Sequence, residues 1–355
     1  MGDVSWGVVM TVREPPVLVQ ANVAWHLASG ASEVHVYLDD PHDPAFYMLK
    51  SMPGCRVVRC TLDHWRTQAK RRARPASQVR RQSLNANHAL SRTACDWLIH
   101  LDADEFLLQE RPIAGEMAAL NGTAMALQLP VWERIYLPGS APETLFEGGF
   151  MPALTAPGDA RSENRAVARR VFGADRGYRR LGLLGHAAGK VAVPVGQGFS
   201  LSIHTAFLDR GGERARARLR RSTSARILHF DGLTPLHWIL KLLRYASYDP
   251  EILDRIVTRH RRSQIADAAA CAGHAPGLRA FHDRLRYLTP RQMGDLQALG
   301  LLDCRAFDPT TGRSNLALDL TVGAFDAVLQ ERERTLLESS GLSQSLSEFG
   351  SRPRA

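Results

Sequence analysis

The 355-residue chain has few cysteines and no long hydrophobic run. Its five cysteines form no C-x-x-C pair, which argues against a disulfide framework and against a zinc site. No run of roughly 18 apolar residues occurs, and the first residues lack the basic and apolar regions of a signal peptide. We therefore expect a soluble, cytoplasmic protein.

Lysine is also scarce, because 41 of the 45 basic residues are arginine. Arginine suits bidentate binding of phosphate, although a GC-rich coding sequence would produce the same bias. The most basic segment, residues 66–81, holds seven positive residues and no acid. It could be a solvated loop, or it could attract an anionic donor, an acceptor or a membrane surface. No aromatic residues interleave with these charges, so we expect no specific nucleic-acid binding.

The order of the first elements indicates an α/β fold. Apolar residues predict strands at 6–12 and 33–38, and a helix at 17–29 that begins after two prolines. Strand, helix and strand in this order predict a parallel sheet with a right-handed crossover. A strand at 56–61 and a helix at 77–94 follow. We expect a mostly parallel sheet of Rossmann type, flanked by helices.

Three acidic residues follow a short apolar run. The run 97–101 is typical of a buried strand, and it is followed by Asp102, Asp104 and Glu105. Because side chains alternate along a strand, Asp102 and Asp104 point to one side and repel each other unless a cation lies between them. Hard oxygen ligands suit Mg²⁺ or Mn²⁺. A solvated turn is the alternative, but acids between two apolar segments are costly without a counter-charge.

The two earlier strands end in charged residues as well, with Arg13 after the first and Asp39 after the second. In open α/β sheets, ligands bind outside the carboxyl ends of the strands. We therefore expect these strand ends to converge with Asp102 on one crevice.

The segment Trp97–Leu107 resembles the signature of family-2-like glycosyltransferases with a GT-A fold, in which a tryptophan and an apolar strand precede D-x-D-E-F. The resemblance covers roughly residues 5–245. It implies that Asp102 and Asp104 hold a divalent metal against the diphosphate of a nucleotide sugar. It also implies that the helix at 77–94 packs beside the nucleotide, where Gln82 would face the donor.

A second motif, His229-Phe230-Asp231-Gly232, resembles the H-F-x-G end piece of metal-dependent GT-A transferases. The resemblance implies that His229 completes the metal site; His204 is the weaker alternative. A core histidine without a ligand role is the simpler interpretation. The lysine that other GT-A families place after the glycine is absent, so Lys241 or a nearby arginine would have to contact the phosphates.

The expected reaction is metal-dependent transfer of a sugar, with inversion, to a hydroxyl of a saccharide or glycoconjugate acceptor. The expected ion is Mn²⁺ or Mg²⁺, and the favoured donor is a UDP-sugar. The remaining expected residues are Arg13, or an arginine of the 66–81 segment, for the phosphates, Asp39 for the base or ribose, and Gly232 near the donor. Glu133, Asp231 or Glu105 is expected as the general base.

Two rival functions fit part of the pattern. A haloacid-dehalogenase-type phosphatase also ends a strand in D-x-D, but it needs Thr or Val soon after the second Asp and a strand near the chain start. A non-catalytic nucleotide-sugar or glycan-binding protein on the same scaffold, attached to a membrane through its arginines, is the other.

The expected organisation is a catalytic domain at 1–245, a helical region at 246–338 and a flexible tail at 339–355. Residues 123–132 predict a further strand, and residues 137–189 lack periodicity and predict long loops. Residues 235–258 predict an amphipathic helix that Pro250 divides.

Overall fold

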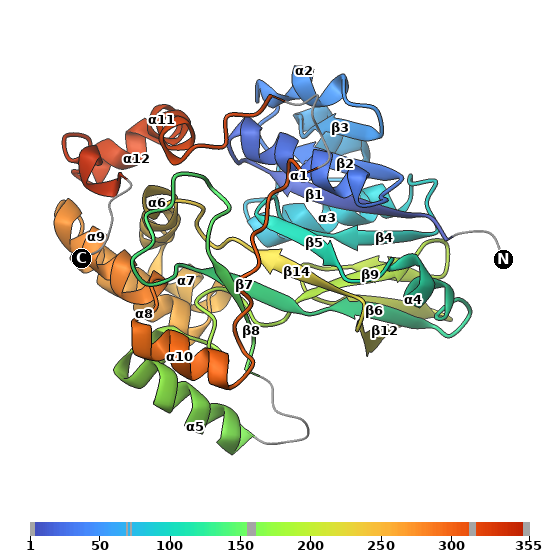
Figure 1. Cartoon of the computed structure of the whole chain (residues 1–355). Helices are drawn as coiled ribbons and strands as arrows, with labels where there is room; N and C mark the ends of the chain where they lie inside the picture. Colours follow the sequence, from blue (N-terminus) through green and yellow to red (C-terminus); the bar gives the residue numbers. More distant parts are fainter. Residues whose placement is uncertain (1–3, 69, 72, 155–160, 312–316, 351–355) are drawn as a thin grey trace. The chain divides into compact units, whose positions relative to one another are not determined.

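The computed structural model describes residues 4–68, 70, 71, 73–154, 161–311 and 317–350 (Figure 1). The chain forms two compact units. The first contains residues 1–131, 188–228 and 309–318, and the second contains residues 132–187, 229–308 and 319–355. This division differs from the predicted boundary at residue 245, because the chain leaves the first unit after Val131 and returns at Ala188 to complete its sheet.

The first unit is built on a seven-stranded sheet with the order β13-β6-β9-β4-β1-β2-β3. The strands are β1 (Trp6–Val12), β2 (Glu33–Leu38), β3 (Cys55–Arg59), β4 (Trp97–His100), β6 (Met125–Leu129), β9 (Lys190–Pro194) and β13 (Arg218–Arg221). Neighbouring strands are parallel except around β9, which is antiparallel to both β4 and β6. The predicted mostly parallel α/β sheet is confirmed.

Helices connect the parallel strands. They are α1 (Pro16–Ala28), α2 (Ala45–Lys50) and α3 (Gln78–Leu90), and a short π-helix, η1 (His64–Gln68), precedes α3. Helices α1 and α3 were predicted, and α2 was not. Proline opens α1, where a missing N–H costs nothing, and the Ser77 hydroxyl caps α3 by accepting the Arg80 N–H. Ala86 and Ala89 of α3 pack into a core cluster with Val9 and Leu98 of the sheet.

Smaller elements complete the first unit. They are β5 (Glu105–Gln109), α4 (Ala114–Ala118), β10 (Phe199–Leu201), β11 (Ala206–Arg210), β12 (Glu213–Arg216) and β14 (Ala225–His229), whose last residue begins the second unit. Strands β10, β11 and β12 form a three-stranded sheet, and β5 lies beside β14. Phe199, Leu201 and Ala206 extend the core cluster.

The second unit combines a strand pair with helices. Its elements are β7 (Val131–Ile135), β8 (Gly149–Pro152), α5 (Arg161–Phe172), η2 (Gly173–Tyr178), α6 (Pro235–Ala246), α7 (Pro250–Ile256), α8 (Arg259–Ala270), α9 (Ala275–Arg286), α10 (Pro290–Ala298), α11 (Val322–Arg332), α12 (Arg334–Ser339) and η3 (Leu346–Phe349). Rings of Phe146, Phe150, Phe230 and Phe307 pack edge-to-face or tilted and form an aromatic core.

Several predicted elements differ from the structure. The single strand expected at 123–132 is two strands, β6 and β7, separated by Pro130, and the loops expected at 137–189 contain β8 and α5. The predicted break at Pro250 is confirmed. Within the expected flexible tail, Leu342 and Phe349 are buried; residues 351–355 lie outside the described part.

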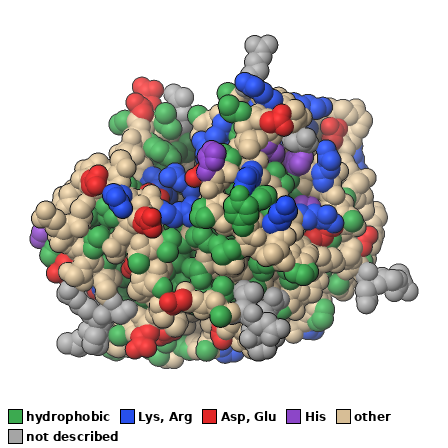
Figure 2. Space-filling view, turned by 90° about the horizontal axis from the view of Figure 1, so that it is seen from above, with side chains coloured by type: hydrophobic (Ala, Val, Ile, Leu, Met, Phe, Trp, Pro, Cys, Tyr) green, Lys and Arg blue, Asp and Glu red, His purple; other side chains and the backbone are tan. Residues whose placement is uncertain are grey.

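The arginine excess appears on the surface. Lys and Arg side chains are prominent on the face drawn in Figure 2, where histidine and hydrophobic side chains lie among them. Among the described residues, no helix has the length and hydropathy needed to cross a bilayer.

Gly189, the residue directly before β9, offers a test of the fold. Its φ is +70°, and an added Cβ would lie 2.2 Å from the Leu129 carbonyl oxygen. Gly196 has a similar φ of +74° but open space around it. We expect Gly196→Ala to lower the free energy of unfolding by about 1 kcal/mol and Gly189→Ala by at least about 2 kcal/mol, because the second substitution adds a clash to the backbone strain. Urea unfolding of both variants measures this, and equal losses would contradict the β9 geometry.

Candidate active site

The acidic turn after β4 is closed by its own residues. The Glu105 carboxylate accepts the Asp102 N–H at 2.8 Å, and the Glu105 N–H donates to the Asp102 carbonyl at 3.1 Å. Phe106 and Leu107, which have no exposed surface, return the chain to the core as β5. The apolar residues on both sides therefore hold the acids at the carboxyl end of β4.

Helix α1 fixes the same turn from outside. The Asn22 side-chain amide donates to the carbonyls of Ala103 and Glu105 at 3.0 and 2.8 Å. The His26 Nε2 accepts the Leu107 N–H at 3.1 Å, so its Nδ1 carries the proton and donates to Asn22 Oδ1 at 2.8 Å. These buried bonds satisfy peptide groups that a sharp turn would leave without partners.

A lysine supplies positive charge to the turn. The ammonium group of Lys190, at the start of β9, lies 2.6 Å from Asp102 Oδ2 and 3.0 Å from Glu105 Oε2, and its side chain has no exposed surface. Gln82 of α3 donates to the other Asp102 oxygen at 2.6 Å. The counter-charge that the acids require is thus partly internal. Sequence reasoning missed Lys190, although one of only four lysines opens an apolar strand.

The charges of this group reinforce one another. Burial by itself would raise the pKa of Asp102, but the ammonium of Lys190 and the ring of His100 hold it far below its usual range. Burial likewise opposes the charge of Lys190, yet the two carboxylates raise its pKa. Asp102 and Lys190 can therefore both stay charged at neutral pH.

The residues of the turn fit a divalent cation. Each Asp102 oxygen makes one of the contacts described and keeps a second lone pair, and the Asp102 side chain is 27% exposed. Asp104 adds a second hard oxygen donor two residues later and is 5% exposed. Carboxylate oxygens of this kind are the ligands of Mg²⁺ and Mn²⁺.

The basic segment contributes to the end of β2. Asp39 accepts two bonds from Arg81, at 2.7 and 2.9 Å, and one from Arg74 at 2.6 Å. Two arginines of the segment thus fold back on the sheet and do not belong to a wholly solvated loop; Arg72 lies outside the described residues. Arg13, after β1, is exposed.

In the second unit, Glu133 of β7 is buried and bonded to backbone. Its two oxygens accept the N–H groups of Leu184 and Gly185, each at 2.7 Å, and Nδ1 of His229 lies 3.7 Å away. Burial alone would raise the pKa of Glu133, but the neighbouring imidazole of His229 and the charge of Arg286 lower it. Glu133 is therefore ionised at neutral pH and a weak base.

Asp231 is similarly engaged. Arg261 donates two bonds to its carboxylate, at 2.9 and 3.1 Å, and the ammonium of Lys241 lies 3.5 Å away. Despite burial, which alone would raise it, the pKa of Asp231 lies well below its usual range because of Arg261 and Lys241. Lys241, suggested from sequence as a phosphate ligand, thus pairs with Asp231.

Gly232 has a geometric role. Its φ is +77°, and an added Cβ would lie 2.4 Å from Cβ of Trp238. The turn that follows His229 therefore requires a glycine at this position, whether or not Gly232 also lies near a donor.

The structure brings some predicted residues together within each unit. Asp102 contacts Gln82, and Glu133 lies beside His229. Asp102 and Asp104 belong to the first unit and His229 to the second, so their joint binding of one ion stays a prediction. His204 is in the first unit, where its Nδ1 lies 3.0 Å from the Gly189 carbonyl.

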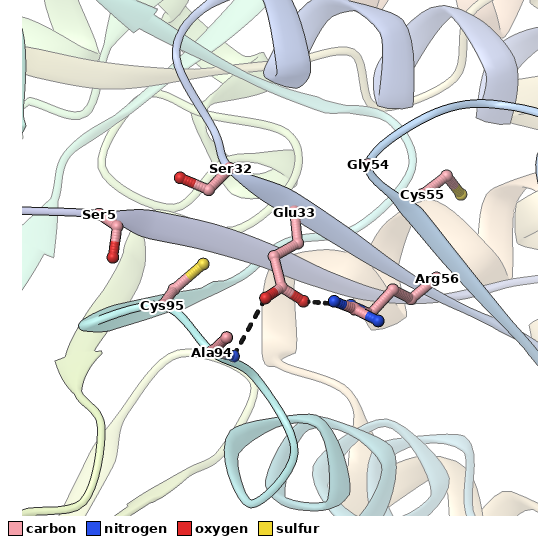
Figure 3. A pocket seen from close by; sticks show the side chains of 8 residues that line it. All are labelled: Ser5, Ser32, Glu33, Gly54, Cys55, Arg56, Ala94 and Cys95. Atoms are coloured by element: carbon pink, nitrogen blue, oxygen red, sulfur yellow. Dashed lines mark hydrogen bonds and ion pairs between the residues drawn. The ribbon is translucent and has the colours of Figure 1, made fainter.

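A pocket of about 310 Å³ lies at the amino ends of the strands, where β2 and β3 begin (Figure 3). Its carboxylate, Glu33, accepts the Ala94 N–H and one bond from Nε of Arg56, and it also contacts His35. These partners neutralise Glu33 within the pocket. The acidic turn, at the other end of the strands, is the stronger candidate for a functional site.

No protein-family model matches the chain, and no curated protein matches it. One similar solved structure is a CMP:2-keto-3-deoxy-manno-octonic acid synthetase complexed with CTP, 15% identical, covering 45% of this chain and 68% of that chain with a TM-score of 0.26. Another is S. aureus TarS 1–349, 9% identical, covering 79% of this chain and 80% of that chain with a TM-score of 0.29. The functional proposal therefore rests on the residues of this chain.

The Lys190 ion pair can be tested by a double-mutant cycle. Lys190→Met leaves two carboxylates without their counter-charge, and we expect it to lower the free energy of unfolding by about 3 kcal/mol. In the double variant Lys190→Met/Asp102→Asn, one of those carboxylates is neutral, so the loss should be smaller than the sum of the single losses. Urea unfolding measures all four proteins; additive losses would contradict the pairing.

Asp326 of α11 gives a pH test. The Thr234 hydroxyl, which caps α6 directly after the His229–Gly232 turn, donates to Asp326 at 2.5 Å. Burial raises the pKa of Asp326 to about 7. From about pH 4 to about pH 7 the unfolded chain has lost a proton that the folded chain retains, so this carboxyl makes stability fall as pH rises through that window. Asp326→Asn should remove this loss.

Urea unfolding at about pH 4, 6 and 8 measures the effect of Asp326. The variant should exceed the wild type most at pH 8 and least at pH 4. A difference that is independent of pH would show that Asp326 is not buried as described.

Proposed function

We propose that this chain is a metal-dependent glycosyltransferase that moves a sugar from a nucleotide-diphosphate donor to a hydroxyl of a saccharide or glycoconjugate acceptor. The observation that carries the proposal is the acidic turn Asp102–Glu105 at the carboxyl end of β4, held by Lys190, Gln82 and α1. The local pattern of tryptophan, apolar strand and D-x-D-E-F supports it from the sequence.

The position of the turn in the sheet supports nucleotide binding. Strand β1 lies between β2 and β4, so the chain moves to one side of β1 and later returns to its other side. In open α/β sheets, ligands bind at the carboxyl ends beside such a reversal. The residues after these three strands are Arg13, Asp39 and Asp102. We assign Arg13 to the phosphates and Asp39, oriented by Arg74 and Arg81, to the base or ribose.

In this proposal Asp102 and Asp104 hold Mn²⁺ or Mg²⁺, and His229 is the further ligand that the H-F-x-G motif implies. When bound, the cation neutralises charge that grows on the leaving diphosphate, with UDP as the favoured nucleotide. Gln82 and Lys190 keep the Asp102 carboxylate oriented and ionised. Gly232 provides the turn after His229.

The acceptor hydroxyl must lose a proton, and Glu133 and Asp231 were the first choices for its base. Their lowered pKa values make both weak bases, and their oxygens are bonded to backbone or to Arg261. We propose that they stay ionised during turnover and position His229 and its neighbours. The weak basicity of Glu133 and Asp231 also favours a second candidate function, a protein that binds nucleotide sugars without transferring them.

Asp104→Asn tests the proposal. It keeps the shape of the side chain but removes a charged metal ligand, so metal-dependent release of UDP from a panel of UDP-sugars should fall by at least about 100-fold. Asp209→Asn, at an exposed residue of β11, is the matched control and should retain activity. Wild-type activity in Asp104→Asn would refute the transferase. Binding of UDP with Mn²⁺ but no turnover by the wild type would identify the binder.

A further inference from the structure

Two histidines lie against each other in the second unit. The rings of His186 and His229 have centroids 4.7 Å apart with planes 37° from parallel. His229 is buried and His186 is half-buried. Nothing in the sequence marked His186, which lies in a region without periodicity. Its nearness to His229 arises only from the fold.

The two residues before His186, Leu184 and Gly185, are held by hydrogen bonds to both their N–H groups and their carbonyls. Glu133 accepts the N–H groups of Leu184 and Gly185. Their carbonyls lie 2.9 Å from Gln264 Nε2 and 2.9 Å from His260 Nε2, both on α8. Four backbone groups are thus bonded to three buried side chains. The arrangement places His186 rigidly and does not depend on a regular helix or strand.

Gly185 shows how tightly this segment packs on its neighbours. An added Cβ would lie 2.6 Å from Glu133 Oε2 and 2.8 Å from His229 Cε1. Its φ is not in the left-handed region, so the need for glycine here is steric. The backbone passes directly over the Glu133–His229 pair and carries the second imidazole to it.

The position of the Glu133 carboxylate also fits a metal-binding role of His186 and His229. Metal-ligating histidines usually direct one ring nitrogen at a carboxylate or carbonyl, which fixes the ring and raises its basicity. Nδ1 of His229 faces Glu133 Oε2 at 3.7 Å, so Nε2 is directed away from that carboxylate.

We propose that His186 and His229 together supply two imidazole nitrogens to one divalent transition-metal ion, with Glu133 orienting His229. Imidazole favours transition-metal ions such as Co²⁺, Ni²⁺ and Zn²⁺ over Mg²⁺, which prefers oxygen ligands. The inference rests on the proposed function for its catalytic meaning, because it narrows the ion of that site to a nitrogen-binding metal. The two-histidine binding itself is separable from sugar transfer.

The test is a titration of the full chain with Co²⁺, followed by visible absorption and calorimetry, without nucleotide or sugar. Mg²⁺ is titrated in parallel and should bind at least about tenfold more weakly to the wild type. His186→Gln and His229→Gln should each weaken Co²⁺ binding by at least about tenfold. His42→Gln, which removes an exposed imidazole of the first unit, should leave binding unchanged.

A second variant separates ligation from packing. His186→Cys places a thiolate at the same position, and thiolates bind Co²⁺ and Zn²⁺. It should retain Co²⁺ binding and add an absorption band from sulfur to cobalt, which a purely packing role of His186 would not produce. Wild-type Co²⁺ affinity in His186→Gln, or no such band in a folded His186→Cys, would overturn the inference.

The titrations also distinguish this inference from the proposed function. If the histidine variants lose Co²⁺ binding and the wild type turns over no nucleotide sugar, the His186–His229 metal site is supported and the glycosyltransferase function is refuted. If sugar transfer requires a metal but His186→Gln binds Co²⁺ like the wild type, the glycosyltransferase function is supported and the His186–His229 metal site is refuted.

Discussion

The contact between Lys190 and the carboxylates of Asp102 and Glu105 is the interaction on which the first unit's site depends. A buried ammonium without these partners, or these acids without the ammonium, would be strongly unfavourable. The direction of β9 follows from the same requirement. Because β9 is antiparallel to β4, with Ile99 opposite Ala192, its first residue reaches the carboxyl end of β4. A strand parallel to β4 in that place would begin at the amino end of β4.

The internal charge also shapes what the acidic turn can do. Lys190 balances part of its negative charge within the protein, and Gln82 fixes the Asp102 carboxylate from α3. The turn then presents Asp102 in one orientation, and Asn22 and His26 of α1 hold the backbone of the turn in place. A carboxylate that is oriented in advance suits the divalent ion that we propose at this turn.

Local sequence determined the parts that could be predicted. The bounds of β1 and β2 match the apolar runs, and the capping serine marks α3. The acidic turn was found because its strand and its acids are contiguous. Lys190 could not be found in this way, since 88 residues separate it from Asp102, nor could the contact of His186 with His229. Helix α5 was missed because it is rich in arginine and its buried apolar residues, Val171 and Phe172, stand only at its C-terminal end.

The arginine bias, which the sequence left open between phosphate binding and codon usage, is partly structural. Arg134 is 1% exposed, stacks 4.1 Å from the Tyr136 ring and donates to the carbonyls of Gly232 and Leu233. Arg261 neutralises Asp231, the residue directly before Gly232. Guanidinium groups thus hold the turn after His229 in shape, a role that lysine, with no planar fork, fills poorly.

The most direct measurement of the central claim is the thermal stability of the wild-type chain with UDP, with Mn²⁺ and with both. A nucleotide-diphosphate site completed by a cation predicts that UDP raises Tm clearly only when Mn²⁺ is present, because ligands that bind the folded state stabilise it by mass action. An equal Tm in all conditions at millimolar ligand, or a UDP shift that does not depend on Mn²⁺, would contradict a metal-dependent donor site at the acidic turn.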